Sequence, residues 1–206
     1  HLFVLYNYIV NLYIIRCMLY EKYIKVYNNA LPLKSISSLI KWLNLQNERK
    51  SFDAGKTGGH GKDSTDSKIR KVQILNLTQK SESLTNVHWT NVLVASFLKA
   101  AGNYISEFPY CRGIKYVNQL EALRYEKTGH YRYHVDSGQG HTRTLSAILI
   151  LNNDYEGGEL CFDDKGSDFS MSVEPGSLIM WPSNFLFPHK VKPVTKGTRY
   201  SVVGWL

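Results

Sequence analysis

Three side chains in the second half of the chain have the types and spacing of a metal site. His134 and Asp136 lie two residues apart in a strand-like run, where alternate side chains point to the same face, so an imidazole and a carboxylate can reach one ion. His189 lies further along, where a later strand should begin, and supplies a second nitrogen. Two imidazoles and one carboxylate leave adjacent positions of a non-haem Fe(II) ion open, whereas four protein ligands close a structural zinc site. The pattern therefore predicts an iron centre with room for exchangeable ligands.

Taken alone, a His-x-Asp triplet is more often a surface histidine beside a turn aspartate. Arg199 and Ser201 shift that balance, because they share one face of a later strand-like run, Gly197 to Val203. A guanidinium fork next to a hydroxyl suits a carboxylate. We therefore expect the guanidinium of Arg199 to lie deeper in the cavity that holds the three predicted ligands.

The elements that must position these residues are short strands. The 14 tyrosines and the 13% aromatic content favour pleated, half-buried surfaces over a helical bundle. Turn signals such as Lys127-Thr128-Gly129, Gly157-Gly158 and Glu174-Pro175-Gly176 separate a series of strand-like runs, namely QLEALRYE, HYRYHVD, RTLSAILILN, GELCF, FSMSV, SLIMW, PHKVKPV and RYSVVGWL. Many short strands punctuated by Gly and Pro predict a sandwich, jelly roll or barrel.

Two amphipathic helices are expected before these strands. The first has Pro32 in its first turn and a stripe formed by Leu33, Ile36, Ile40 and Leu43. The second spans Asn86 to Ala101, with Asn86 as a possible N-cap, Gly102 at its end, and a stripe formed by Trp89, Leu93, Phe97 and Ala101. Both helices should pack outside a sheet. Residues 51–68, rich in Gly, Ser, Asp and Lys, predict a loop before a strand near Ile69 to Leu77.

A chain of 206 residues can bury one full core, so one globular domain is expected. Its division is predicted as a possible non-native or disordered leader (1–17), N-terminal helices and outer strands packing on the core (18–112), and the β core itself (113–206). The leader is apolar but short and contains Asn7, Asn11 and Arg16, so it is a weak candidate for a membrane segment. Since the first methionine is Met18, the native start could lie there.

The net charge of +8 is spread along the chain without a dense basic run, so there is no strong nucleic-acid signal and a solvated basic surface is expected. Cys17, Cys111 and Cys161 are an odd number at unrelated spacings, which makes a disulfide scaffold improbable. A reducing compartment, and hence a cytoplasmic location, fits better. Nothing in the sequence indicates the oligomeric state.

The ordered motifs around the predicted ligands resemble the Fe(II)/2-oxoglutarate oxygenases, in particular their prolyl 4-hydroxylase-like branch. The resemblance covers roughly the last 90 residues, the usual size of one catalytic core. It rests on seven stretches: Leu123-Arg124-Tyr125, Gly129 to Asp136, Arg143-Thr144-Leu145, Gly157-Gly158-Glu159-Leu160, Pro175-Gly176-Ser177-Leu178, Pro188-His189-Lys190-Val191 and Gly197 to Ser201.

This resemblance implies a mainly β fold with flanking helices (α+β) around a double-stranded β-helix, or jelly-roll, core. It implies that His134, Asp136 and His189 are the catalytic iron ligands and that Arg199 pairs with the distal carboxylate of 2-oxoglutarate. Tyr125 resembles the family's pocket tyrosine, and Ser201 is assigned to the same co-substrate site. Tyr131 resembles the tyrosine that faces the substrate, although simple strand packing would explain it nearly as well. The implied cofactors are Fe(2+), 2-oxoglutarate and O2, with L-ascorbate as reductant.

The implied reaction is hydroxylation of an unactivated C–H bond with release of succinate and CO2. A prolyl residue in a peptide or protein is the first choice of substrate. The alternatives are a free amino acid or other small metabolite, a methylated nucleic acid, and a non-catalytic metal-binding β-barrel module. The carboxylate of Asp136 argues against a halogenating relative, in which a small residue replaces it.

The sequence departs from the family at one strand. Several members carry a tyrosine there that helps to hold 2-oxoglutarate, and here the run Ile148-Leu149-Ile150 is wholly apolar. Other polar residues have ordinary explanations: we expect solvent-facing or structural roles for His60, His88, His130 and His141, a turn at Asp163 and Asp164, and a solvated strand edge at Lys190, Lys192 and Lys196.

Overall fold

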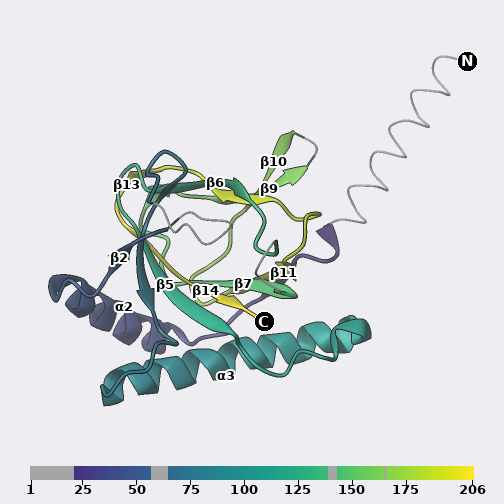
Figure 1. Cartoon of the computed structure of the whole chain (residues 1–206), viewed down its shortest axis with the longest axis horizontal. Coiled ribbons are helices and arrows are strands. Elements are labelled where there is room, and N and C mark those ends of the chain that lie inside the picture. The colour runs from purple at the N-terminus through teal and green to yellow at the C-terminus, as the bar shows by residue number, and fades with distance from the viewer. Residues whose placement is uncertain (1–20, 57–64, 139–142, 165) are drawn as a thin grey trace, which may run out of the picture.

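Two β-sheets face each other, and two helices cover the outer face of the larger one (Figure 1). The computed structural model describes residues 21–56, 65–138, 143–164 and 166–206. The predicted leader, 1–17, lies outside the described residues. Within the described residues, no helix is both long and apolar enough to cross a membrane.

Among the described residues, the larger sheet has seven strands, each antiparallel to its neighbours. Their order is β1 (Lys25–Tyr27), β11 (Leu178–Pro182), β7 (Leu145–Ile150), β14 (Arg199–Trp205), β5 (Gln119–Tyr125), β4 (Gln73–Asn76) and β2 (Asp53–Ala54).

The second sheet has five strands in the described part of the chain, also antiparallel. Their order is β10 (Ser167–Met171), β9 (Leu160–Asp164), β12 (His189–Val191), β6 (His130–His134) and β3 (Arg70–Lys71). A separate pair joins β13 (Val194–Lys196) to β8 (Glu156–Gly157). The predicted fold class, mainly β with flanking helices, is confirmed.

The inner strand β7 contributes side chains to two separate buried layers. Every residue of β7 is buried. Ala147 and Leu149 belong to the core under the helices, whereas Ile148 and Ile150 belong to the core between the two sheets. Since successive side chains of a strand point to opposite faces, a strand covered on both faces reads as a continuous apolar run.

The first helix, α2 (Leu33–Glu48), begins directly after Pro32, as expected. Its predicted stripe is partly wrong. Ile36 and Leu43 are buried together with Leu39 and Trp42, but Leu33 is 63% exposed. The reason is that the buried face runs through Leu39 and Trp42, and Leu33 in the first turn lies outside that face.

The second helix, α3 (Leu84–Glu107), is longer than predicted at both ends. Ser83, not Asn86, is the N-cap, and its hydroxyl accepts a hydrogen bond from the backbone N–H of Asn86. Gly102 does not end the helix, because Tyr104 extends the buried stripe by a further turn. The predicted stripe is correct, since Trp89, Leu93, Phe97 and Ala101 are all buried. A short 3-10 turn, η1 (Pro109–Cys111), follows.

The strand expected at Ile69 to Leu77 is divided between the two sheets: β3 joins the smaller sheet, β4 joins the larger one, and the buried Val72 lies between them. The predicted loop contains the short strand β2, and its residues 57–64 lie outside the described residues. The strand-like runs after Gly113 all contain observed strands.

Candidate metal centre

Two histidines face each other across neighbouring strands of the smaller sheet. In the antiparallel pair β6 and β12, His134 is directly opposite His189. The centroids of their imidazole rings are 4.2 Å apart. The pairing of the two strands therefore brings together two nitrogen donors that are far apart in the sequence.

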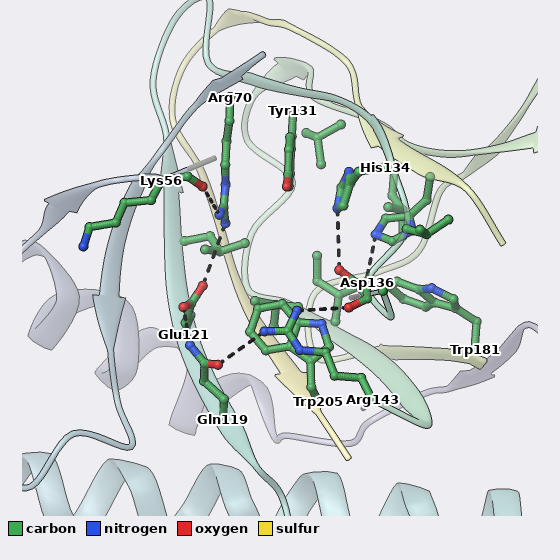
Figure 2. Close-up of a pocket in the computed structure, with 18 of the residues that line it drawn as sticks. Lys56, Arg70, Gln119, Glu121, Tyr131, His134, Asp136, Arg143, Trp181 and Trp205 are labelled. Carbon is green, nitrogen blue, oxygen red and sulfur yellow. Dashed lines mark hydrogen bonds and ion pairs between the residues drawn. The ribbon is translucent and has the colours of Figure 1, made fainter. Parts of the chain in front are cut away.

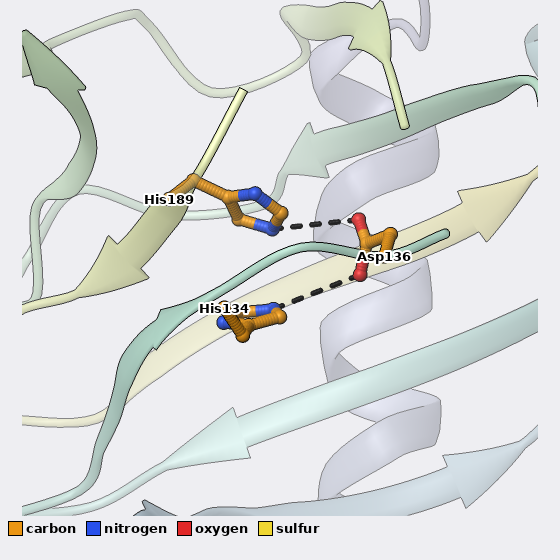
Figure 3. Close-up of side chains that lie close together, drawn as sticks. All are labelled: His134, Asp136 and His189. Atoms are coloured by element: carbon orange, nitrogen blue, oxygen red, sulfur yellow. Dashed lines mark ion pairs between the residues drawn. The ribbon is translucent and has the colours of Figure 1, made fainter. Parts of the chain in front are cut away.

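Asp136 completes the cluster from a bend after β6 (Figure 3). The observed strand is two residues shorter than the predicted run HYRYHVD, since β6 ends at His134 and Asp136 is not part of it. Its Oδ1 lies 3.6 Å from Nε2 of His134, and its Oδ2 lies 3.4 Å from Nε2 of His189. One ligand atom from each of the three residues lies within 4.8 Å of the others, and no other group of three or more such residues occurs in the part of the chain that the structure describes.

Backbone carbonyls fix the orientation of both imidazoles. Nδ1 of His134 lies 2.9 Å from the carbonyl oxygen of Arg132, and Nδ1 of His189 lies 3.1 Å from that of Phe187. Because a carbonyl oxygen can only accept, each Nδ1–H donates and each Nε2 keeps its lone pair. Metal-bound histidines characteristically donate their second N–H in this way. The donor set thus fits a divalent transition-metal ion.

Two serines that the sequence analysis missed hold the carboxylate. The Ser146 hydroxyl donates a hydrogen bond of 2.6 Å to Oδ2 of Asp136, and its oxygen lies 2.8 Å from Oγ of Ser183. Burial alone would raise the pKa of Asp136, but His189, His134 and the Ser146 hydroxyl hold it below its ordinary value. The carboxylate therefore stays ionised. The sequence did contain one signal for this contact, since Ser146 is the polar residue within the apolar run of β7.

Aromatic rings surround the two imidazoles. Tyr131 stacks on His134 with ring centroids 3.6 Å apart, whereas Phe162 and Trp181 pack against His189 with centroids 5.9 and 5.0 Å away. Burial, together with His189, lowers the pKa of His134 to about 3. The surroundings of His134 therefore favour its neutral imidazole, the form that binds a metal.

The cluster opens into a cavity of about 550 Å³ between the sheets (Figure 2). Figure 2 shows the hydroxyl of Tyr131 directed into this space. Its apolar lining includes Leu123, Ile148, Leu160, Trp181, Val191, Val203 and Trp205. Its polar lining includes Arg70, Gln119, Glu121 and Arg143, which the sequence analysis did not assign to the site.

Arg199 lies close to this cavity but does not line it. Its guanidinium is 1% exposed, donates a hydrogen bond of 2.8 Å to Oγ of Ser201, and has its central carbon 5.3 Å from the ring centroid of Tyr125. Tyr125 lines the cavity of the histidine cluster, whereas Arg199 lines a neighbouring cavity of about 380 Å³. Leu160 lines both. The expectation that Arg199 shares the cavity of the cluster is therefore corrected to an adjacent one.

The apolar strand that departs from the family pattern contributes to both spaces. Ile148 lines the cavity of the histidine cluster, and Ile150 lines the cavity of Arg199. On the strand where several family members carry a tyrosine, this chain thus presents aliphatic side chains to both cavities.

The remaining polar candidates have local partners. Both ring nitrogens of His130 lie within hydrogen-bond distance of backbone carbonyls, and His88 is exposed. Asp163 and Asp164 are the last residues of strand β9 and not part of the turn predicted there, and Asp163 accepts a hydrogen bond from the backbone N–H of Gly166. Lys190 and Lys192 pair with Asp168, and Lys196 pairs with Glu156. His60 and His141 lie outside the described residues.

Comparison with known proteins connects this geometry to a family. The family model described as the 2OG-Fe(II) oxygenase superfamily matches residues 120–206. A PKHD-type hydroxylase of Crocosphaera subtropica is 40% identical over 99 residues, which are 45% of this chain and 44% of the relative. A PKHD-type hydroxylase of Shewanella oneidensis is 42% identical over 91 residues, which are 40% of each chain. The chain thus spans less than half the length of these curated relatives.

Solved structures show the same fold. A prolyl-4-hydroxylase of Pseudomonas putida superposes with a TM-score of 0.69 at 19% identity, covering 89% of this chain and 92% of that one. A prolyl hydroxylase of Trichoplax adhaerens, in complex with a peptide fragment of the hypoxia inducible factor oxygen degradation domain, also gives 0.69, at 16% identity and with coverage of 89% and 82%. The predicted double-stranded β-helix core is confirmed.

Proposed function

We propose that the protein is a 2-oxoglutarate-dependent dioxygenase that hydroxylates an unactivated C–H bond, a proposal supported by the match of residues 120–206 to the 2OG-Fe(II) oxygenase superfamily. The observation that carries the proposal is the convergence of His134, Asp136 and His189 on one point of a partly apolar cavity. A structural metal site would have no use for such a cavity beside its ligands.

In this proposal the two Nε2 atoms and the carboxylate of Asp136 hold Fe(II). When bound, the iron activates O2, so that decarboxylation of 2-oxoglutarate to succinate and CO2 is coupled to hydroxylation of the substrate, with L-ascorbate as reductant. The residues of the chain supply orientation and exclude water. Trp181 and Phe162 keep the ring of His189 in a dry environment, and Ser146 keeps the carboxylate turned toward both imidazoles.

Arg199 is proposed to bind the distal carboxylate of 2-oxoglutarate, together with Ser201 and Tyr125. Its Nε is buried and has no hydrogen-bond partner among the described residues. A buried guanidinium with an unused donor is costly unless an anion pairs with it. Tyr125, between the two cavities, would then contact the co-substrate along its length, and Tyr131 would face the substrate from its stack on His134.

A prolyl residue in a peptide or protein is our first choice of substrate. It is supported by the likeness to PKHD-type hydroxylases and by the fold shared with prolyl hydroxylases, one of them in complex with a peptide. A free amino acid or small metabolite is the second choice. A small zwitterion would need different contacts from a peptide, because the site must recognise it through its own charged groups.

The test is formation of the iron chelate without oxygen, followed by turnover in air. Anaerobic addition of Fe(II) and 2-oxoglutarate to the protein should produce the weak visible charge-transfer band of the chelate, and air should then release succinate. His189→Ala should abolish both, whereas His88→Ala, a change at an exposed histidine, should alter neither. Normal succinate release by His189→Ala would rule out the proposed centre.

A further inference from the structure

The wall of the cavity opposite the histidine cluster is polar and has no part in the proposed iron or 2-oxoglutarate sites. Four residues, Arg70, Gln119, Glu121 and Arg143, form this far wall. Figure 2 shows Arg70, Glu121 and Gln119 on the side away from His134, with Arg143 beside Trp205 at the base. They come from β3, from β5 and from the segment before β7. The fold thus assembles the far wall from three separate parts of the chain.

Arg70 is held in place by three contacts, one of which is a long ion pair with Glu121. Its guanidinium donates a hydrogen bond of 3.0 Å to the carbonyl oxygen of Lys56 and lies over the ring of Tyr131, 4.6 Å from the centroid. Its contact with Oε2 of Glu121 is 3.8 Å, too long for a hydrogen bond. Among the described residues, the buried Nε of Arg70 has no hydrogen-bond partner.

Glu121 is buried, and only one of its two carboxylate oxygens has a hydrogen-bond partner among the described residues. Its Oε1 accepts a hydrogen bond of 2.7 Å from the amide of Gln119, while its Oε2 has no hydrogen-bond partner within the described part of the chain. Burial raises the pKa of Glu121, and Arg70 and Arg143 oppose that shift. The single carboxylate of Glu121 therefore interacts with the guanidinium groups of both Arg70 and Arg143.

Arg143 carries the second positive charge. Its central carbon lies 3.7 Å from the centroid of the Trp205 ring, which fixes the plane of the guanidinium. Its hydrogen bonds, each 3.4 Å long, go to the backbone oxygen of Asp136 and to the amide oxygen of Gln119. Both acceptors are neutral, so these contacts do not compensate the charge.

The far wall therefore has an excess of half-buried positive charge facing the cavity. Within the far wall, two guanidinium groups face the one carboxylate of Glu121. The carboxylate of Asp136 also attracts Arg143, but it is directed at the two histidines, where it is a proposed metal ligand. A charge that is partly removed from water is unfavourable unless a counter-ion pairs with it. An anionic ligand group with two oxygens would restore the balance, because it can accept from both guanidinium groups.

We infer that the far wall is a subsite for a carboxylate group of the primary substrate, bound by Arg70 and Arg143. This inference rests on the proposed oxygenase function, since it assigns a substrate group to the same cavity. The carboxylate has two sources: the α-carboxylate of a free amino acid, or an acidic side chain next to the oxidised residue of a peptide. The subsite is separate from the residue proposed to hold the distal carboxylate of 2-oxoglutarate, because Arg199 lines the neighbouring cavity.

Matched acids and amides test the subsite. L-proline is compared with L-prolinamide, and the peptide acetyl-Glu-Pro-Gly-amide with acetyl-Gln-Pro-Gly-amide. Each is titrated into the anaerobic complex with Fe(II) and 2-oxoglutarate, following the charge-transfer band, and into the metal-free protein, following tryptophan fluorescence, to which Trp205 contributes. We expect at least one acid to bind ten-fold or more tightly than its amide.

Variants assign that preference to the far wall. Arg70→Gln and Arg143→Gln should each abolish the preference for the acid, and Arg70→Lys, which keeps the charge but not the planar fork, should weaken it. Lys196→Gln removes one positive charge from an exposed ion pair and should leave the preference intact. Circular dichroism of every variant shows whether it has folded. Because the wild-type comparison of acid and amide needs no variant, a poorly folding substitution does not remove the test.

The outcomes separate the inference from the proposed function. Absence of the charge-transfer band in the wild-type protein would refute the oxygenase function itself. A normal band with equal affinity for acid and amide, or with no binding of either acid, would overturn the carboxylate subsite alone. It would also be overturned if Arg70→Gln and Arg143→Gln raised the 2-oxoglutarate requirement and left the preference unchanged, because the far wall would then hold the co-substrate. Preference within the proline pair assigns a free amino acid, and preference within the peptide pair assigns an acidic neighbour.

Discussion

Ser146 donates a hydrogen bond of 2.6 Å to Asp136, and this contact joins the inner strand β7 of the larger sheet to the bend that follows β6 in the smaller one. Asp136 is not held by a strand, so its carboxylate depends on this donor for its direction. Because the Ser146 proton points to the carboxylate, Ser183 donates in turn to Ser146. A short relay of hydroxyl groups thus orients one of the three proposed ligands.

Ser146→Ala should weaken metal binding. Loss of a residue that orients a ligand typically lowers metal affinity about 10- to 100-fold. The measurement is an anaerobic titration with Fe(II), or with Co(II) as a visible probe. Ser177→Ala is the matched control, since Ser177 is equally buried and bonds to Asn28 far from the cluster. If both variants bound metal like the wild type, the relay would have no role at the site.

Arg199→Gln should raise the 2-oxoglutarate concentration that half-saturates the chelate. Loss of a buried charged partner costs about 2 to 5 kcal/mol, which corresponds to about 30-fold or more. Binding of Fe(II) alone should not change, because Arg199 does not line the cavity of the histidine cluster. Arg132→Gln, a change at an exposed arginine on β6, serves as control. An unchanged 2-oxoglutarate requirement would reject the assignment of Arg199.

The metal-free protein should lose stability in mild acid through His134. Burial, then the neighbouring His189, lowers the pKa of His134 from 6.5 to about 3. The unfolded chain therefore binds this proton more readily than the folded one, so the stability is complete above pH 6.5 and decreases as the pH falls toward 3. Between pH 7 and pH 5 the loss should be about 2 kcal/mol. Because the pKa of Asp136 is lowered, that carboxylate stays ionised between pH 7 and pH 5 in the folded protein.

Urea unfolding at pH 7, 6 and 5 measures this effect. His134→Gln removes the titrating group and should make stability less dependent on pH than in the wild type. His88→Gln, at an exposed histidine, should retain the wild-type dependence. Parallel stability curves for the wild type and His134→Gln would contradict the assignment.

The sequence predicted local patterns well and spatial neighbours poorly. The strand runs and the buried stripe of α3 follow from periods of two and of about 3.6 residues, which any part of the chain expresses by itself. In contrast, Ser146 reaches Asp136 and Glu121 lines the cavity because of how β7 and β5 are placed in the larger sheet. Arg70 reaches the cavity because the chain changes sheets at Val72, and no local period encodes that change.

Gly102→Ala should stabilise the protein. A glycine suggested a helix end, but Gly102 lies within α3, and an added Cβ there would meet nothing within 4 Å. Alanine in a helix interior is favoured over glycine by about 0.5 to 1 kcal/mol. Gly204→Ala is the opposite case, since its Cβ would lie 2.6 Å from the Phe97 ring, and it should destabilise. Chemical denaturation of both variants measures the two effects, and a destabilised Gly102→Ala protein would contradict the exposed position of this residue.

Gly158→Ala should disturb the Arg199 cavity in addition to straining the backbone. Gly158 has φ +69°, and a Cβ there would lie 3.1 Å from Cδ of Arg199 and 3.0 Å from Cγ2 of Val194. Gly166 has φ +91° but no atom within 4 Å of such a Cβ, so Gly166→Ala reproduces the strain without the contact. Each variant should lose about 1 to 2 kcal/mol of stability from its left-handed backbone. Gly158→Ala should further raise the 2-oxoglutarate concentration needed for the chelate band, because the guanidinium must move to make room. If the two variants required the same 2-oxoglutarate concentration as the wild type, the approach of Gly158 to Arg199 would not matter for co-substrate binding.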